Sequence, residues 1–219
     1  MLDLALAVLH EPDPDALLPL LSAELIRGCD AEAVIHKGDK WTEESGTIRL
    51  WRSDGLSLAV DPGTAARPKT PDSAGAAPAG GRRADVDLAG HGGRLIRQGY
   101  PFAGHYEVAR ERAPITACQA VGEAAWRRSA TARFAREALG AEHVLAIPLP
   151  RCERYVNGFL VYRSRGDFPE DRIEYARRIQ PLLDGVERQS RVLRGWRVAS
   201  ASSHAPGEVD ERARAHALT

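Results

Sequence analysis

Two apolar segments in the second half of the chain place the strongest constraint on its fold. Residues 144–149 and residues 155–163 are rich in branched and aromatic side chains, and a short polar turn separates them. Such a pair predicts an antiparallel hairpin. In the second segment Leu160 and Tyr162 share one face of the strand, whereas Phe159 lies on the other. The chain must therefore build at least part of an antiparallel sheet.

The N-terminal part of the chain predicts one helix followed by an antiparallel meander. Leu17, Leu21 and Leu25 recur at every fourth position, which is the spacing of an amphipathic helix. Asp13 suits the N-cap of that helix, and Gly28 is its expected end. Three short strands are then expected, over residues 33–36, 47–52 and 56–60.

The arginine-rich middle and the C-terminal part predict further helices. The middle helices are expected over residues 94–112, 121–128 and 131–139. Gly99 and Pro101 break the first of these. A longer helix is expected from Pro169, which suits a first helical turn, to Trp196. Together these elements predict a mixed α/β (α+β) fold with a central antiparallel sheet flanked by helices and a long C-terminal helix.

The last of these helices carries an apolar seam of the heptad type. Its residues recur at alternating spacings of three and four: Ala176, Ile179, Leu183, Val186, Ser190 and Leu193. A seam of this kind packs either on the sheet of its own chain or on the same helix of a second copy. We take Ile179, Leu183, Val186 and Leu193 as the candidate contacts of a homodimer, with packing on the sheet as the alternative.

Two segments have the composition of unfolded chain. Residues 61–92 contain no aromatic residue and few apolar ones. They cannot offset the entropy of ordering, so a mobile loop is expected, with residues 90–93 as a flexible joint at its end. Residues 197–219 have the composition of a linker. Residues 1–196 are therefore expected to form a single domain, followed by a flexible tail.

Charge, hydropathy and cysteine usage exclude several classes of protein. Thirty Lys and Arg residues balance thirty Asp and Glu residues, which argues against a protein whose whole surface binds nucleic acid. The apolar runs are shorter than the roughly 20 residues of a membrane span. The N-terminal segment lacks the positive charge of a signal peptide. Because Cys29, Cys118 and Cys152 are far apart, we expect a cytoplasmic protein without a disulfide framework.

The sequence carries no motif of a familiar catalytic or cofactor-binding type. It lacks a Gly-x-Ser-x-Gly elbow, a phosphate-binding Gly-rich loop and a His-Glu-x-x-His helix. We therefore expect no enzymatic activity, no cofactor and no metal. Two alternatives remain for the reactive side chains. His105, His143, Cys118 and Cys152 could converge on a metal ion, or Cys118 could act as a nucleophile with one of the two histidines.

Four short motifs in the second half of the chain occur in a fixed order. Residues 99–106 read GYPFAGHY, and residues 139–150 read LGAEHVLAIPLP. Residues 164–168 read SRGDF, and residues 180–183 read QPLL. In order and spacing they resemble the HPL…HY, LGV-x-H-x-LA-[IV]-PLP, RSxxDF and RPHL motifs of the sensory domains that precede LuxR-type helix-turn-helix modules in bacterial regulators. The resemblance covers roughly residues 94–194.

The resemblance implies a GAF-like domain, which is a small antiparallel sheet flanked by helices that senses a ligand or holds a dimer. In such a domain the ligand pocket lies between the sheet and its helices. The residues that would line it carry aromatic or imidazole rings: Trp51, Tyr100, Phe102, His105, Tyr106, Trp126 and Phe134. Packing in the core is the alternative for each of them.

The sequence departs from the pattern of this family at two places. Residues 61–92 look like an insertion. The sequence ends with Ala217-Leu218-Thr219, where a LuxR-type module would open with Leu-Thr-Pro-Arg-Glu. We therefore expect a sensor domain without its DNA-binding module, so that DNA would be bound only through a C-terminal module absent from this sequence.

The expected function is that of a regulatory sensor or dimerisation domain of a LuxR-type transcriptional regulator. Such a domain would bind an unknown small-molecule effector or a partner, and it would not bind DNA itself. A homodimer is the expected assembly, and no contact with a membrane is expected. The first alternative is a ligand-free protein–protein interaction or dimerisation module, and an enzyme comes last.

Overall fold

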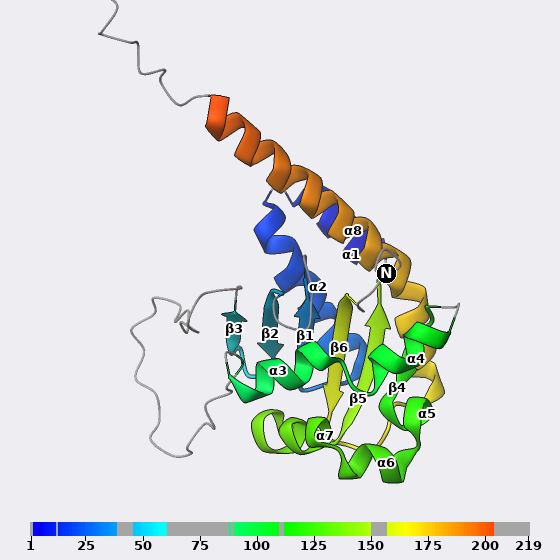
Figure 1. The fold of residues 1–219 in the computed structure, drawn as a ribbon. Helices are drawn as coiled ribbons and strands as arrows, with labels where there is room; N and C mark the ends of the chain where they lie inside the picture. The colour runs from blue at the N-terminus through cyan, green and yellow to red at the C-terminus, as the bar shows by residue number, and fades with distance from the viewer. Residues whose placement is uncertain are drawn as a thin grey trace, which may run out of the picture.

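A six-stranded antiparallel sheet with helices on both faces organises the chain (Figure 1). The structure is a computed structural model that describes residues 2–11, 13–38, 46–60, 88, 90–109, 112–149 and 157–203. The strand order is β3-β2-β1-β6-β5-β4. The strands are β1 (Ala33–Lys37), β2 (Ile48–Arg52), β3 (Ser57–Val60), β4 (Ile115–Thr116), β5 (His143–Pro148) and β6 (Gly158–Arg163). The expected mixed α/β (α+β) fold, with its antiparallel sheet flanked by helices, is confirmed.

The hairpin expected from the sequence lies inside this sheet. β5 pairs antiparallel with β6 along its whole length. On the other side of β5, β4 pairs only with Leu145 and Ala146. Pro148, which has no N–H group to donate, therefore lies beyond the reach of β4. The side chains of β6 alternate as predicted, with Tyr162 in the core on one face of the sheet and Phe159 in the core on the other.

Short helices cover one face of the sheet. They are α3 (His91–Gln98), α4 (Phe102–Val108), α5 (Ala117–Val121), α6 (Glu123–Arg128), α7 (Ala130–Phe134) and a π-helical turn (Ala135–Leu139). Helices are found in all three middle regions expected from the sequence. The first of these, expected over residues 94–112, instead begins at His91 and ends at Val108, and the break at Gly99 and Pro101 separates α3 from α4. The short α5 and its neighbour β4 were not anticipated. The core beneath these helices includes Tyr106, Trp126 and Tyr162.

The segment 90–93 starts a helix and is not the flexible joint expected from the sequence. α3 begins at His91, and Gly93 is buried in its first turn. A Cβ atom on Gly93 would overlap the carbonyl oxygen of Leu88. Glycine therefore permits close backbone packing here. Residues 61–87 of the expected loop lie outside the described residues.

On the other face of the sheet lie α1 (Leu2–His10), α2 (Pro14–Cys29) and α8 (Glu170–Ser203). α2 and α8 contact the strands, and α1 packs on α2. α2 begins as predicted, because the side chain of Asp13 accepts a hydrogen bond from the N–H of Asp15. It runs past the expected stop at Gly28, and Asp30 ends it in the left-handed region at φ 52°. Gly28 instead lets α2 approach α8, because a Cβ atom there would overlap the ring of Tyr175.

The apolar seam of α8 is buried within one chain. Its residues Ala176, Ile179, Leu183, Val186 and Ser190 are each at most 2% exposed. α8 packs on α2 and on β5, whose apolar faces need this cover. The candidate dimer contacts Ile179, Leu183 and Val186 are therefore core residues, and the alternative of packing on the sheet is the one observed. Leu193, the fourth candidate, is only partly buried.

α8 also extends beyond the point at which the sequence predicts a flexible tail. The helix includes residues 197–203, which contain neither glycine nor proline and so nothing that would stop it. Residues 204–219 of the expected tail lie outside the described residues. Among the described helices, α8 included, none combines the length and the apolar character needed to cross a membrane.

Candidate functional site

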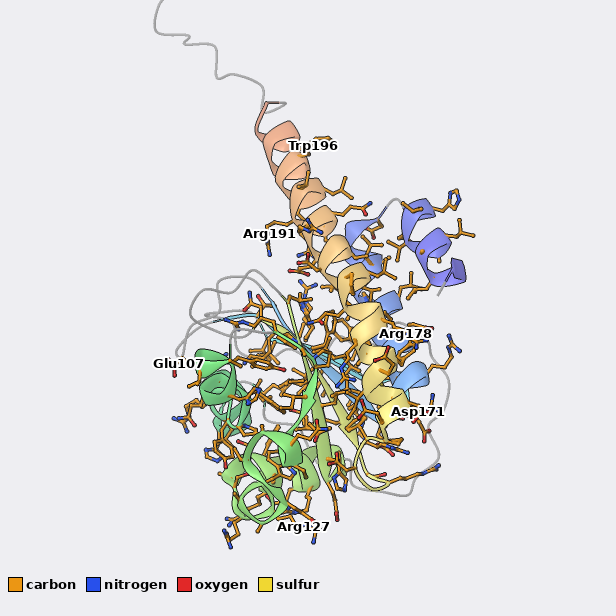
Figure 2. All side chains as sticks on the ribbon, turned by 90° about the vertical axis from the view of Figure 1, so that its right-hand side faces the viewer. Glu107, Arg127, Asp171, Arg178, Arg191 and Trp196 are labelled. Atoms are coloured by element: carbon orange, nitrogen blue, oxygen red, sulfur yellow. The ribbon has the colours of Figure 1, made fainter. Side chains whose placement is uncertain are left out.

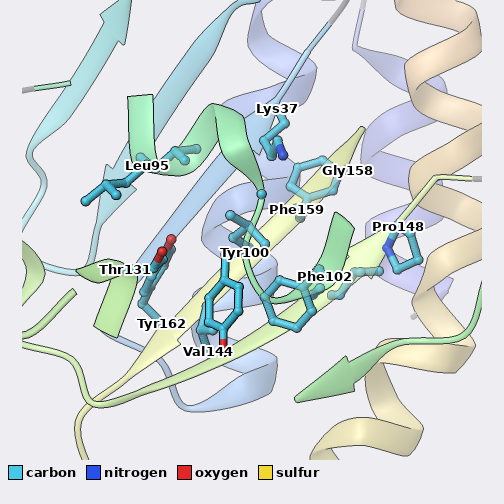
Figure 3. A pocket seen from close by; sticks show the side chains of 15 residues that line it. Lys37, Leu95, Tyr100, Phe102, Thr131, Val144, Pro148, Gly158, Phe159 and Tyr162 are labelled. Atoms are coloured by element: carbon cyan, nitrogen blue, oxygen red, sulfur yellow. The ribbon is translucent and has the colours of Figure 1, made fainter. Parts of the chain in front are cut away.

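A small pocket lies between the sheet and the helices α3 and α4 (Figure 3). β5 and β6 form its floor, which includes the side chains of Val144 and Leu160. Leu95 of α3 and Phe102 of α4 provide apolar walls, and Tyr100 comes from the turn between these helices. A mostly apolar lining that several elements contribute is the usual make-up of a small-molecule site.

The turn between α3 and α4 positions the aromatic residues of this pocket. Gly99 ends α3 in the left-handed region at φ 71°, a conformation that glycine adopts without steric cost. α4 then begins at Phe102, and both Tyr100 and Phe102 line the pocket. Phe102 is 3% exposed, whereas Tyr100 is 41% exposed. Tyr100 therefore lies at the mouth of the pocket, and Phe102 lies inside it.

Polar side chains also border the pocket. Lys37, at the end of β1, is 3% exposed, and Thr131 of α7 is also buried. Burial raises the pKa of the Tyr162 phenol on β6, so this hydroxyl stays protonated at neutral pH and can donate a hydrogen bond. Lys37, Thr131 and Tyr162 thus add polar groups to a mostly apolar lining.

Sequence reasoning did not single out Lys37, because a lysine at the end of a strand is usually part of the solvated surface. The sequence did contain one indication of its position, which is the alternation of side chains between the two faces of β1. Ala33 and Ile35 face the core beneath α3, and Lys37 occupies the next position on the same face. Its side chain therefore enters the layer between the sheet and the helices.

The pocket is small in this structure. Its volume of about 20 Å³ is room for about one water molecule. A metabolite would therefore need part of the cover to move outward. Tyr100 is suited to this movement, because it is partly exposed and belongs to a turn, whereas β5 and β6 are held by pairing on the sheet.

The aromatic residues predicted for a ligand pocket lie in different places. Tyr100 and Phe102 line the pocket. Trp51 packs on the opposite face of the sheet, with the core that includes α2. Its neighbour Leu50 faces the core beneath the short helices. The alternation of β2 is clear in the sequence, but the sequence does not show which of its two faces carries the pocket.

The other predicted pocket residues lie away from the pocket: Tyr106, Trp126, Phe134 and His105. The Tyr106 hydroxyl donates a hydrogen bond of 2.6 Å to the carbonyl oxygen of Ala113. The Trp126 indole donates one of 2.8 Å to the carbonyl oxygen of Glu142. These two residues are buried with their polar atoms paired, so the alternative of core packing applies to them. His105 lies beside Tyr106, with ring centroids 5.1 Å apart.

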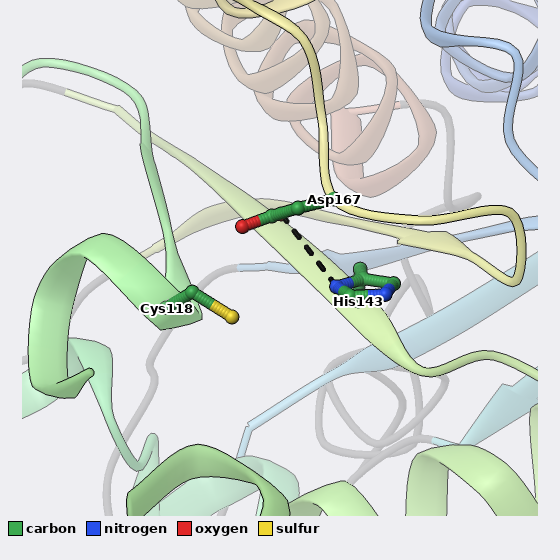
Figure 4. Close-up of side chains that lie close together, drawn as sticks. All are labelled: Cys118, His143 and Asp167. Atoms are coloured by element: carbon green, nitrogen blue, oxygen red, sulfur yellow. Dashed lines mark ion pairs between the residues drawn. The ribbon is translucent and has the colours of Figure 1, made fainter. Parts of the chain in front are cut away.

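Three reactive side chains form a second cluster, which does not line the pocket: Cys118, His143 and Asp167 (Figure 4). Their sulfur, nitrogen and oxygen atoms all lie within 4.8 Å of one another. Of the four residues considered for a metal ion, the structure thus brings together Cys118 and His143. Cys152 lies outside the described residues, and His105 lies in a surface groove of α4.

The environment of Cys118 argues against a catalytic nucleophile. Burial, reinforced by the neighbouring Asp167, raises the pKa of the Cys118 thiol to about 11. A cysteine nucleophile needs a thiolate, which a lowered pKa would supply. At neutral pH the thiol of Cys118 is instead protonated.

Comparison with protein-family models and with curated proteins finds no match to this chain. The class of the protein is therefore the one that its fold defines, a mixed α/β domain with an antiparallel sheet between two layers of helices. Its function is inferred from the pocket, from the reactive cluster and from the motifs of the sequence.

Proposed function

We propose that this chain is the regulatory sensor domain of a LuxR-type transcriptional regulator, and that it binds a small-molecule effector between its sheet and the helices α3 and α4. The pocket carries this proposal, because a paired sheet forms its floor and a partly exposed aromatic residue stands at its mouth. Segments that cover a pocket, as α3, α4 and the turn with Tyr100 do here, open or close when a ligand binds. DNA would be bound by a C-terminal module and not by this domain.

The lining favours an effector with an apolar body and an anionic group. Leu95, Ile96 and Val144 offer aliphatic contacts, and Lys37 borders the same space. A carboxylate or phosphate that reaches the Lys37 ammonium would form a charge-assisted hydrogen bond in a site with little water. The apolar body would take the space that opens when Tyr100 moves outward.

β5 connects the pocket to α8, which would be the output helix of the sensor. Ala146 faces the core beneath α3 and α4, and the next residue, Ile147, faces the core that α8 shares. The side-chain amide of Gln180 on α8 donates a hydrogen bond of 2.5 Å to the carbonyl oxygen of Pro148 at the end of β5. A displacement of β5 by a bound effector would therefore reach α8 directly.

Thermal-shift screening of the full chain against a metabolite library tests the binding of an effector. A ligand at 100 times its Kd stabilises the fold by about 2.7 kcal/mol, which raises the Tm of a chain of this size by roughly 5 to 10 °C. With acidic compounds, Lys37→Met is expected to show a Tm rise smaller than that of the wild type by roughly half or more. The control Val108→Ala, at an 87% exposed position of α4, is expected to leave every shift unchanged.

A broad library without any compound that raises the Tm would overturn the proposed function. An acidic binder that stabilises Lys37→Met as strongly as the wild type would instead contradict the assigned ligand class. The two failures are therefore distinguishable.

A protein–protein interaction module is the second candidate, and the far end of α8 is the observation that favours it. This end projects from the rest of the domain (Figures 1 and 2). Val192 is 53% exposed there, and Trp196 is 69% exposed. Large apolar side chains in such a position are typical of contact surfaces. The partner would be a second copy of the chain, whose α8 presents the same residues.

Light scattering or sedimentation equilibrium of the full chain tests this second candidate. It predicts the mass of a dimer, and the mass of a monomer for the double variant Val192→Ser with Trp196→Ser. The control Leu9→Ser, at a 71% exposed position of α1, is expected to keep the dimer. A wild-type chain that stays monomeric at high concentration would exclude a dimer formed in this way.

A further inference from the structure

Three side chains from separate parts of the sequence meet at one end of the sheet. Cys118 belongs to the first turn of α5, His143 is the first residue of β5, and Asp167 lies in the turn between β6 and α8. The pairing of β5 with β4 and with β6 brings these segments together. Sulfur, nitrogen and oxygen donor atoms are thereby gathered within 4.8 Å of one another.

Neighbouring groups hold the Asp167 carboxylate in place. The N–H of Phe168 donates a hydrogen bond of 2.8 Å to Oδ1 of Asp167. The Thr116 hydroxyl donates one of 3.3 Å to Oδ2. Thr116 is itself fixed as the N-cap of α5. Outer partners of this kind orient the ligands of metal sites.

His143 points a buried nitrogen atom at this cluster. Its side chain is 10% exposed, and its Nδ1 has no hydrogen-bond partner among the described residues. Oδ1 of Asp167 lies 3.8 Å from this nitrogen. A buried nitrogen without a partner destabilises a fold unless a ligand satisfies it. The unsatisfied Nδ1 atom is therefore best explained by a group that binds between His143 and its neighbours.

We propose that Cys118, His143 and Asp167 bind a zinc ion. Thiolate, imidazole and carboxylate are the ligands of zinc in proteins, whereas calcium and magnesium select oxygen ligands alone. Tetrahedral coordination places ligand atoms about 3.5 Å apart. The ligand atoms of the three side chains lie within 4.8 Å of one another, so small side-chain rotations would bring them to this spacing. They leave the fourth position of the ion open, as in zinc sites that bind water or a small ligand.

An ion can enter this site from solvent. The Asp167 side chain is 36% exposed, and Cys118 is partly buried. Only His143 belongs to the buried layer. Binding would displace the proton of the Cys118 thiol to solvent. The site is separate from the effector pocket, because none of its three residues lines that pocket, so the two proposals stand independently.

Titration of the metal-free full chain with zinc chloride and with cobalt chloride tests the site. Zinc is expected to bind with a stoichiometry of about one ion per chain and to raise the Tm by mass action. Cobalt is expected to give the near-ultraviolet absorption of a thiolate–cobalt bond. Cys118→Ser should abolish that absorption and weaken zinc binding by roughly 100-fold or more. The matched control Cys152→Ser should keep both the thiolate–cobalt absorption and the wild-type affinity for zinc.

Asp167→Asn provides a second variant at a partly exposed position. Its amide oxygen can still accept the hydrogen bond from the N–H of Phe168, and its amide NH2 can donate to the hydroxyl oxygen of Thr116. It should unfold at the wild-type Tm without zinc, and it should show little of the rise that zinc gives the wild type. The proposal is overturned if the wild type shows no thiolate–cobalt absorption. It is equally overturned if Cys152→Ser, and not Cys118→Ser, removes that absorption.

Discussion

Replacement of Leu183 by aspartate is expected to unfold this domain and not to separate two copies of it. Leu183 is fully buried among the apolar residues that join α8 to α2 and to the sheet. The substitution removes a buried aliphatic side chain and places a charge in its position, which costs about 5 kcal/mol or more. This is comparable with the whole stability of a typical domain. Circular dichroism and urea unfolding measure the effect.

Val192→Asp is the matched control on the same helix. Because Val192 is 53% exposed within one chain, this change should alter the free energy of unfolding of the monomer by no more than about 0.5 kcal/mol. If Leu183→Asp remained folded with the wild-type urea midpoint, and lost only a dimer, the packing of α8 described here would be wrong. The heptad seam would then be an interface between copies.

Replacement of Glu187 by alanine is expected to cost about 1 to 3 kcal/mol, because it removes the carboxylate that lies against the buried polar side chain of His36. Glu187 Oε2 lies 3.5 Å from Nε2 of His36, and both side chains are at most 9% exposed. Arg49 and Arg194 border the same small space. Urea unfolding at neutral pH measures the loss. Glu174→Ala, which removes an exposed ion pair with Arg178 on the outer face of α8, should change stability little.

The same pair predicts how stability depends on pH. Burial alone would raise the pKa of Glu187, but His36, assisted by Arg191 and Arg194, holds it below its usual value. A glutamate in the unfolded chain titrates near about pH 4.3. The stability that Glu187 contributes is therefore present above that pH and is lost as the pH falls through the lower pKa of the folded state.

The wild type should consequently lose more stability than Glu187→Gln between about pH 6 and pH 3, since glutamine has no proton to take up. Unfolding curves for both chains over this range give the comparison. Parallel losses in the two chains would show that the pair between α8 and β1 contributes nothing to the acid sensitivity of the fold.

Local patterns in the sequence were sufficient to predict most of the elements. The alternation of Phe159 and Tyr162 gave the correct faces of β6, because strand side chains point alternately to the two sides. Asp13 gave the correct start of α2, because its carboxylate can accept a backbone N–H. The role of α8 was harder to predict. A seam such as Ile179 and Leu183 buries its apolar surface equally well on a sheet or on a second helix.

Properties that depend on tertiary contacts were not accessible from these patterns. The side of the sheet that Trp51 faces depends on which layer of helices covers that side. Cys118, His143 and Asp167 meet only through the pairing of β4, β5 and β6, so their spacing along the chain carried no indication of a shared site. The close packing that Gly93 permits likewise depends on the position of Leu88.

The central claim, that an effector binds between the sheet and the helices α3 and α4, is tested most directly by methyl NMR of the full chain with the strongest compound from the thermal-shift screen. We expect the largest shift changes at methyl groups that line the pocket, those of Leu95, Ile96 and Val144. The methyl groups of Leu21 and Leu183, in the core on the opposite face, should change less. Changes confined to that opposite core or to the outer surface would contradict the claim.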